Sequence, residues 1–213
     1  MDTGKTTNDS VIRKRKQEVP NVRCIVVTAM LSAVAFILMF LDFSVPIMPS
    51  FIKLDLSELP ALIAAFSLGP VYGVAVCLVK NLLHLLITST GGVGELSNFL
   101  LGAVFVLVAG LIYKHKKSRK SALLGSLLGA AAMAAFSVLS NYFLVYPVYY
   151  NFFNLPEEMV LEMYRALIPS MGNILQCLIV FNMPFTFVKG LASVIITFVI
   201  YKRISPILKG TGR

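Results

Sequence analysis

Charged side chains are scarce in this chain. Asp, Glu, Lys and Arg make up 14% of its 213 residues, and 57% are hydrophobic. A soluble domain carries about 25% charged residues. The hydrophobic residues also occur in blocks of about 17–25 residues, the length of a membrane span. The composition therefore excludes an ordinary soluble domain and predicts one membrane domain.

Motifs for catalysis and nucleotide binding are missing as well. There is no HExxH, no GxSxG and no pair of catalytic carboxylates, so we do not expect an enzyme. The segment GKTT at residues 4–7 resembles the end of a Walker A motif, but the required earlier glycine is absent. Cys24, Cys77 and Cys177 are too far apart for a zinc or redox motif. We expect no metal, and no cofactor held by this chain.

Positive charge is abundant but unevenly distributed. The net charge is +9, and most Lys and Arg residues form three clusters beside hydrophobic blocks. Basic clusters in such positions set membrane topology and contact anionic lipid headgroups, so we do not expect nucleic-acid binding. The clusters are Lys5, Arg13, Lys14, Arg15, Lys16 and Arg23; Lys114, Lys116, Lys117, Arg119 and Lys120; and Lys202, Arg203, Lys209 and Arg213.

The hydrophobic blocks predict an all-α integral membrane protein with six transmembrane helices. Six spans place the three basic clusters on one side, so both termini are expected in the cytoplasm. No cleavage site follows the first block, which we interpret as a retained span. The predicted spans are Val22–Leu41, Leu56–Leu68, Val71–Ile87, Glu95–Tyr113, Ser121–Val145 and Phe185–Tyr201, with an earlier start around Leu178 as the alternative for the last one.

Three regions follow from these spans. Residues 1–20 are polar and basic and predict a disordered tail. Residues 21–209 form the single six-helix domain, and residues 210–213 are a C-terminal tail. The second span is too short to cross a core of about 30 Å, so we expect a partial span that neighbouring helices shield. The less hydrophobic connection 146–176 predicts a short surface helix.

Several polar residues interrupt the hydrophobic blocks. An ionisable group at membrane depth costs about 2.5–3.5 kcal/mol and usually faces a protected interior. At 1.5 Å per helical residue, these groups lie about 15–31 Å from the inner boundary, which is Pro70 for Lys80, Asn81 and His84 and the nearest basic cluster for the others. They therefore lie at the midplane or in the outer half. This placement predicts a small-molecule pocket that opens outward over a sealed hydrophobic floor. The residues are Lys80, Asn81, His84, Glu95, Asn98, Asn141 and Lys189.

Each of these residues also has a purely structural interpretation. Lys80 could extend toward the membrane surface or pair inside the protein. Asn98 and Asn141 could join helices by hydrogen bonds. Glu95 could be a first-turn carboxylate that the helix dipole favours.

Other residues near the predicted pocket receive structural interpretations too. We interpret Asp55 and Glu58 as interfacial or N-terminal helix carboxylates. For His84, the sequence favours a role in helix packing and a role in ligand contact equally. The loop 43–60 could fold over the pocket, and the glycines of TSTGGVG permit close approach of the backbone to a ligand.

Four segments together resemble the substrate-specific (S) components of energy-coupling factor (ECF) transporters, the riboflavin-specific members most closely. The resemblance implies a bacterial plasma-membrane subunit that captures riboflavin from outside. It also implies a transmembrane coupling subunit and two cytoplasmic ATPases as partners, and these partners bind the ATP. The segments are FIKLDLSELPALIAAFSLGPVYGVAVCLVKNLLHLL (51–86), GGVGELSNFLLGA (91–103), LSNYFLVYPVYY (139–150) and NMPFTFVKG (182–190).

The resemblance also implies roles for individual residues. It places Asn98, Asn141 and Lys189 at vitamin contacts, and it includes the pair Lys80 and Asn81 without a defined role. It assigns nothing to His84.

Aromatic and small residues complete the predicted surfaces. Phe51, Leu54 and Phe143 are hydrophobic residues that could enclose a flavin ring. The small residues of the first span match the family's docking motif, and alanines of the fifth span supply a second small-residue surface. These residues are Ala29, Ser32 and Ala33 in the first span, and Ala130–Ala132, Ala134 and Ala135 in the fifth.

Two other functions stay open. The pocket by itself does not name its ligand, so an S component for another vitamin is the first alternative. The second is a small ion-coupled carrier that works alone, although the absence of a convincing internal repeat disfavours an inverted-repeat carrier.

Overall fold

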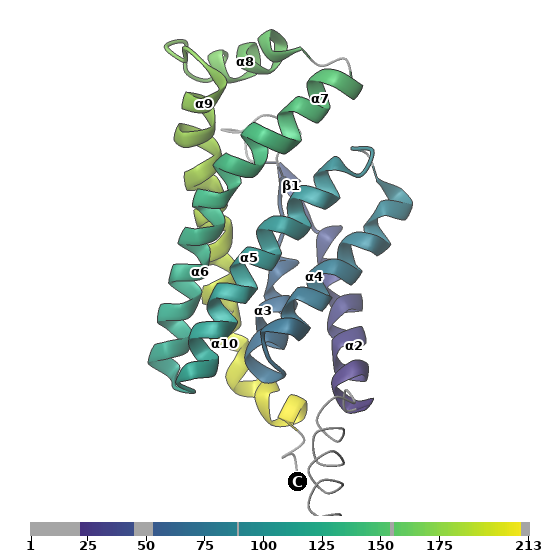
Figure 1. The fold of residues 1–213 in the computed structure, drawn as a ribbon. Coiled ribbons are helices and arrows are strands. Elements are labelled where there is room, and N and C mark those ends of the chain that lie inside the picture. Colours follow the sequence, from purple (N-terminus) through teal and green to yellow (C-terminus); the bar gives the residue numbers. More distant parts are fainter. Residues whose placement is uncertain (1–21, 45–52, 89, 154–155, 210–213) are drawn as a thin grey trace, which may run out of the picture.

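The computed structural model describes residues 22–44, 53–88, 90–153 and 156–209, and these residues are nearly all helical (Figure 1). The strands β1 (Phe43–Ser44) and β2 (Lys53–Leu54) form a short antiparallel pair. The helices are α2 (Val22–Met39), α3 (Glu58–Ser67), α4 (Pro70–His84), α5 (Val93–His115), α6 (Arg119–Ser140), α7 (Tyr146–Phe152), α8 (Glu157–Arg165), α9 (Ile174–Cys177) and α10 (Met183–Lys209).

Five helical segments of the described chain are long and apolar enough to cross a membrane. They confirm five of the predicted blocks, but two are longer than predicted. The expected end before Pro147 is wrong, because the helix that begins at Arg119 continues to Phe152. The last helix begins at Ile174, before Phe185 and close to the alternative start around Leu178. The segments are Val22–Met39, Pro70–Ile87, Val93–His115, Arg119–Phe152 and Ile174–Ile200.

Both longer helices contain a π-helical turn, at Asn141–Val145 and at Leu178–Asn182. Each turn ends two residues before a proline, Pro147 or Pro184. A proline lacks an amide hydrogen and crowds the carbonyl group four residues earlier. The wider turn accommodates the proline, so the helix continues instead of ending. Such turns are frequent at functional sites.

Helix α3 lies among the longer helices (Figure 1) and is almost completely enclosed. Nine of its ten residues are buried, from Glu58 to Phe66. It packs against α2, α4, α5 and α10. At 1.5 Å per residue it is about 15 Å long, half the thickness of the hydrocarbon core. The prediction of a short helix shielded by its neighbours is confirmed.

Small residues permit close contacts between the helices. A Cβ atom at Gly129 of α6 would lie 2.7 Å from the carbonyl oxygen of Phe105 in α5. A Cβ atom at Gly190 of α10 would lie 2.8 Å from the Cβ of Ala130 in α6. Ala130 and Ala134 are buried, so these two alanines belong to internal packing and not to an external surface.

The small residues of α2 divide between two faces. Ala29 and Ala33 are exposed on the same side, one helical turn apart. Ser32 is buried, and its hydroxyl donates to the carbonyl oxygen of Thr28 at 2.8 Å. The predicted grouping of Ser32 with the two alanines on one surface is therefore wrong, because successive helical residues are separated by about 100°.

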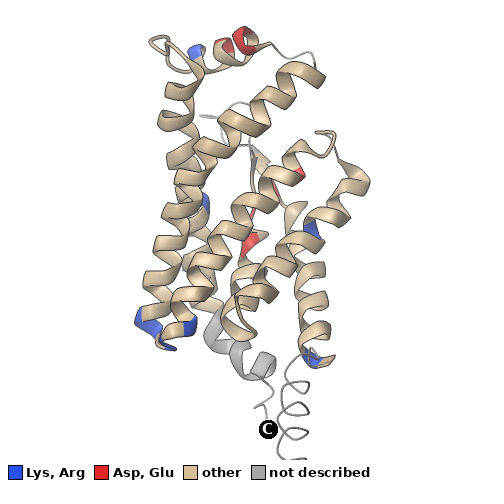
Figure 2. Cartoon of the chain, in the orientation of Figure 1, with Lys and Arg blue, Asp and Glu red and all other residues tan. Residues whose placement is uncertain are grey.

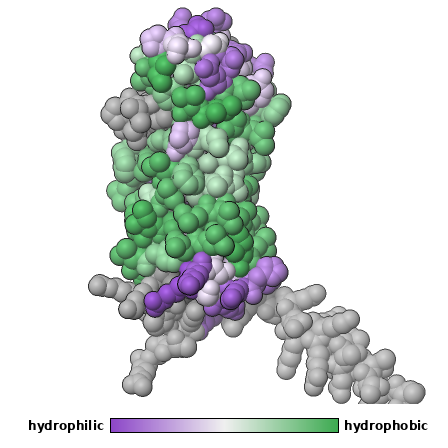
Figure 3. Space-filling model, turned by 90° about the vertical axis from the view of Figure 1, so that its left-hand side faces the viewer, coloured by the Kyte–Doolittle hydropathy of each residue, from purple (hydrophilic) through white to green (hydrophobic). Residues whose placement is uncertain are grey.

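Charge separates the two ends of the molecule. Basic residues gather at the end that contains the α5–α6 loop and the start of α2 (Figure 2). Acidic residues of α8 lie at the opposite end, where α8 confirms the predicted surface helix. Between the ends the visible surface is a hydrophobic belt (Figure 3). This distribution is typical of a membrane protein.

Candidate ligand-binding site

A cavity of about 620 Å³ lies among the helices. Its lining includes four of the residues predicted from the sequence: Glu95, Asn98, Asn141 and Lys189. These residues come from α5, from the first π-helical turn and from α10, so the fold brings together groups that are far apart in the sequence. The volume falls within the usual range for small-molecule sites, about 300–1,000 Å³.

The amide groups of the cavity are held in defined orientations. Asn141 donates from Nδ2 to the carbonyl oxygen of Ser137 at 2.8 Å, which leaves Oδ1 as an acceptor for a ligand. The Oδ1 atom of Asn98 is buried and has no hydrogen-bond partner among the described residues. Buried polar atoms are normally paired, so such an acceptor is suited to a ligand donor.

A chain of hydrogen bonds connects the cavity to helix α8. The Tyr164 hydroxyl donates to Oδ1 of Asn182 at 2.7 Å and lies 2.7 Å from the Tyr146 hydroxyl. All three residues are buried, while Tyr146 and Asn182 line the cavity. Burial raises the pKa of the Tyr164 hydroxyl above its usual range, so this group stays a donor. The contact leaves the Nδ2 group of Asn182 as the donor for a ligand.

A compact ion network contributes Asp55, Glu58 and Lys189 to the cavity wall. The Lys189 ammonium lies 2.9 Å from Oδ2 of Asp55 and 3.4 Å from Oε2 of Glu58. The Lys80 ammonium lies 3.1 Å from Oε1 of Glu58 and also donates to the Ser57 hydroxyl. Two cations and two carboxylates therefore balance each other away from solvent. A buried charge requires such pairing.

The two carboxylates of this network are buried inside the protein. Glu58 is the first residue of α3, which confirms its interpretation as an N-terminal helix carboxylate, and it is 1% exposed. Asp55 precedes α3 and is also buried. Burial alone would raise the pKa of Asp55, but the Lys189 and Lys80 ammonium groups hold that pKa below its usual range.

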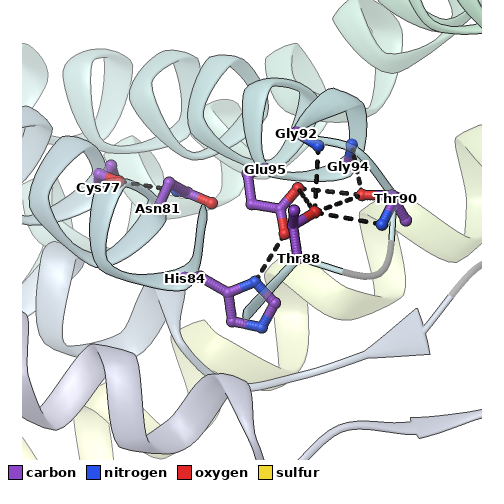
Figure 4. A network of polar contacts seen from close by, with 8 residues as sticks. All are labelled: Cys77, Asn81, His84, Thr88, Thr90, Gly92, Gly94 and Glu95. Carbon is purple, nitrogen blue, oxygen red and sulfur yellow. Dashed lines mark hydrogen bonds and ion pairs between the residues drawn. The ribbon is translucent and has the colours of Figure 1, made fainter. Parts of the chain in front are cut away.

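Glu95 is the centre of a second polar network (Figure 4). Its Oε1 atom lies 2.8 Å from Nδ1 of His84, at the end of α4. Its Oε2 atom accepts from the hydroxyls of Thr88 and Thr90, each at 3.0 Å. The carboxylate therefore joins α4, the α4–α5 turn and α5, and His84, Thr90 and Glu95 all line the cavity.

Four of the remaining predicted residues, all of them described, lie outside the cavity wall. Lys80 and Asn81 are buried, and Asn81 donates to the carbonyl oxygen of Cys77 at 2.7 Å. Leu54 is half-buried in β2 and does not line the cavity. Phe143 is 71% exposed on the first π-helical turn and does not line it either. Phe51 lies outside the described residues.

Sequence reasoning missed several residues of the cavity wall. Asn182, Tyr146 and Asp55 line the cavity without having been singled out as ligand contacts. Asn182 begins the segment NMPF, and its place beside Pro184 is the signal that indicates a π-helical turn. No comparable local signal marks Tyr146 or Asp55, because their roles depend on contacts with distant segments.

The described residues contain no group of three or more His, Cys, Asp or Glu side chains that could hold a metal ion. The site offers amides, hydroxyls and paired charges around a hydrophobic cavity. Together with the long apolar helices, it defines a class: a multi-pass membrane protein that binds a small solute.

Comparison with known proteins identifies the family within this class. The model of the ECF transporter substrate-specific component matches residues 23–201. The chain belongs to this family of transporter components, which confirms the prediction that it is not an enzyme.

Similar proteins cover most of the chain. The riboflavin transporter RibU of Staphylococcus aureus (strain TCH60) is 36% identical, with 92% of this chain and 97% of that protein aligned. The riboflavin transporter FmnP of Bacillus subtilis (strain 168) is 33% identical over 87% of this chain and 93% of that protein. A solved structure described as "Structure and mechanism of the S component of a bacterial ECF transporter" superimposes with a TM-score of 0.69 at 35% identity, covering 87% of this chain and 97% of that one.

Removal of the Lys80 ammonium is expected to destabilise the protein. Lys80→Met leaves Glu58 with one cation where it had two, and breaking a buried pair costs about 3–5 kcal/mol. We therefore expect a lower Tm for the detergent-solubilised protein. The double variant Lys80→Met/Glu58→Gln removes both charges and should recover most of the loss. A double variant less stable than Lys80→Met would contradict the pairing.

The tyrosine chain makes a separate prediction. Tyr164→Phe leaves the Tyr146 hydroxyl and Oδ1 of Asn182 without their common partner, at a cost of about 1–3 kcal/mol. Thermal unfolding should detect this loss. The control Tyr142→Phe changes an exposed tyrosine and should leave the Tm unchanged. Equal Tm values for both variants would show that the chain does not stabilise the fold.

Proposed function

We propose that this protein binds riboflavin in the described cavity and supplies it to an ATP-driven transport complex. This proposal rests on a cavity of about 620 Å³ in which hydrogen bonds to the protein orient the side-chain amides of Asn141 and Asn182. The family and the riboflavin transporters that resemble the chain support this choice of ligand.

The chemistry of riboflavin matches this lining. Its uracil-like edge alternates carbonyl and N–H groups, which pair with an amide donor and an amide acceptor. Asn182 offers the donor and Asn141 the acceptor. Its dimethylbenzene edge and ring faces require hydrophobic and aromatic neighbours, and Met133, Tyr149 and Phe185 line the cavity. The ribityl chain requires hydroxyl and carboxylate partners.

The proposed topology has six spans, of which α3 is a partial one. With the basic end in the cytoplasm, both termini lie there and the α4–α5 turn and α8 lie outside. The polar network of His84, Thr88 and Glu95 then lies close to the external end of the protein. This orientation supports capture of the vitamin from the extracellular side.

The proposed partners are a transmembrane coupling subunit and two cytoplasmic ATPases, with no nucleic acid and no cofactor of its own. Family membership supports association with an ECF transporter module. Ala29 and Ala33 of α2 form an exposed small-residue pair, which permits another helix to approach closely. We place the coupling subunit on this face.

The two alternatives make different predictions for purified protein. An S component for another vitamin would leave riboflavin fluorescence unchanged and bind its own ligand. A carrier that works alone would take up solute in vesicles driven by a proton or sodium gradient, without ATPases. The similarity to riboflavin transporters over most of the chain favours riboflavin over both alternatives.

Riboflavin binding is tested by quenching of flavin fluorescence with purified protein. Asn141→Ala removes one hydrogen bond and should weaken binding about threefold to tenfold. Lys189→Ala should weaken it as well, because Asp55 and Glu58 lose their cation in the cavity wall. Leu139→Ala, an exposed change on the same helix as Asn141, is the control and should bind normally. Wild-type affinity in both site variants would remove these residues from the site, and no quenching by the unmodified protein would reject riboflavin as its ligand.

The docking face is tested separately from ligand binding. Ala33→Leu on α2 should reduce copurification with the coupling module, because a larger side chain prevents close helix contact. Riboflavin affinity should stay normal in this variant. The matched change Met30→Leu keeps the side-chain volume on the exposed surface and should assemble normally. Normal assembly of Ala33→Leu would move the interface elsewhere.

A further inference from the structure

We infer that Tyr164 of α8 is a positioning residue for the ligand, although its side chain lies outside the cavity wall. Its hydroxyl orients the Asn182 amide, so ligand binding and the packing of α8 stabilise each other. This inference rests on the proposed binding of riboflavin and adds a link between the cavity and a surface helix. Three features of the described residues support it: the direction of a hydrogen-bond chain, the shape of an amide side chain, and the position of α8 in the fold.

The hydrogen bonds of Tyr164 run in one direction. A tyrosine hydroxyl has a single proton. Tyr164 donates this proton to Oδ1 of Asn182 at 2.7 Å. The 2.7 Å contact between the Tyr146 and Tyr164 hydroxyls therefore requires Tyr146 as its donor. The chain leads from Tyr146 through Tyr164 to Asn182, and its final acceptor is the oxygen of the amide rather than the nitrogen.

This direction fixes which atom Asn182 presents to the cavity. The oxygen and nitrogen ends of an amide are nearly equal in size, so a half-turn of the side chain exchanges an acceptor for a donor with little change in packing. Asn182 is 5% exposed and lines the cavity, whereas Tyr164 does not line it. With its oxygen bound to Tyr164, the amide has its Nδ2 group available to a ligand. Loss of the Tyr164 hydroxyl removes the donor that distinguishes the two orientations.

Helix α8 belongs to a hydrophobic cluster of its own. Val160, Leu161 and Tyr164 are buried in it together with residues of α7, α9 and both π-helical turns. This cluster is distinct from the one around α3, and α7, α8 and α9 lie together at one end of the molecule (Figure 1). Among the described residues, α8 makes side-chain hydrogen bonds to other segments through Tyr164 and through Arg165, which donates from Nε to the Met171 carbonyl oxygen at 2.9 Å. Of these two bonds, the one from Tyr164 reaches the cavity wall.

The two halves of this link act on each other. A ligand acceptor at Nδ2 favours the orientation of Asn182 whose oxygen accepts from Tyr164, and that hydrogen bond holds α8. A packed α8 in turn holds the amide in the orientation that binds the ligand. By thermodynamic linkage, each event favours the other by the same free energy. The link consists of one hydrogen bond, which corresponds to about a threefold to tenfold change in affinity.

A double-mutant cycle tests the link through ligand binding. Tyr164→Phe should raise the Kd for riboflavin about threefold to tenfold, measured by quenching of flavin fluorescence. In an Asn182→Ala background the same change should alter the Kd less than about twofold, because no amide is left to orient. A general loss of stability would weaken binding equally in both backgrounds. Equal effects in the two backgrounds, or a normal Kd in Tyr164→Phe, would overturn the inference.

Tyr150→Phe is the matched control for this cycle. It removes a buried tyrosine hydroxyl that packs against the same hydrophobic cluster and has no hydrogen-bond partner among the described residues. Its Kd for riboflavin should equal that of the unmodified protein. An increase as large as that in Tyr164→Phe would show that any hydroxyl lost from this cluster weakens binding, and would overturn the role of the Tyr164–Asn182 bond.

Hydrogen exchange measures the link at α8 itself. Saturating riboflavin should slow amide exchange in residues 157–165 of the unmodified protein, because the bound ligand favours the Tyr164–Asn182 bond. In Tyr164→Phe this slowing should be lost from α8 and should remain in the α4–α5 turn, which also contributes to the cavity wall. A purely structural role would speed exchange in α8 by the same factor with and without riboflavin. Equal slowing of α8 in both proteins would overturn the inference.

Asn182→Ala provides the same test from the cavity side, also if Tyr164→Phe does not fold. With riboflavin at saturation, α8 of this variant should exchange at its ligand-free rate, and slowing as strong as in the unmodified protein would reject the link. These outcomes are separate from those of the proposed function. Absence of riboflavin binding by the unmodified protein would reject both, whereas normal binding that does not depend on Tyr164 would reject the inference alone.

Discussion

Charge compensation away from water is the constraint on which this structure depends. Lys80, Lys189, Asp55 and Glu58 are buried or nearly so, and each contacts a group of opposite charge. An isolated charge at this depth would be strongly unfavourable. The network therefore connects the segment before α3, α3 itself, α4 and α10. Because Glu58 at the start of α3 contacts Lys80 of α4 and Lys189 of α10, the network also fixes the position of α3 along these longer helices.

Two prolines shape the wall of the cavity. Pro147 and Pro184 follow the two π-helical turns, and Asn141 and Asn182 belong to those turns. Adding one residue to a helical turn rotates the side chains that follow by about 100° relative to a regular helix. Asn141 begins one turn and Asn182 ends the other, and both amides line the cavity while the two helices stay continuous. Tyr164 then holds the Asn182 amide from outside the cavity.

Most polar groups of the cavity already have hydrogen-bond or ion-pair partners within the protein. This limits the kinds of polar group that a bound ligand can bring. The cation Lys189 is paired, Glu95 accepts three contacts, and the unpaired acceptor of Asn98 requires a donor. An uncharged ligand with amide-like and hydroxyl groups suits these conditions, because it adds hydrogen bonds without adding charge.

The sequence by itself determined the membrane class and five of the long helices. Lipid cannot satisfy backbone or charged groups, so hydrophobic length and basic clusters are read directly from local composition. The same locality explains why Asn98, Asn141, Glu95 and Lys189 were identified. Tertiary structure alone decided their partners. Asp55 and Lys189 are 134 residues apart, and Tyr164 and Asn182 come from different helices, so only helix packing brings these groups together. Phe143 is exposed because the backbone hydrogen bonds of the π-helical turn set the direction of its side chain.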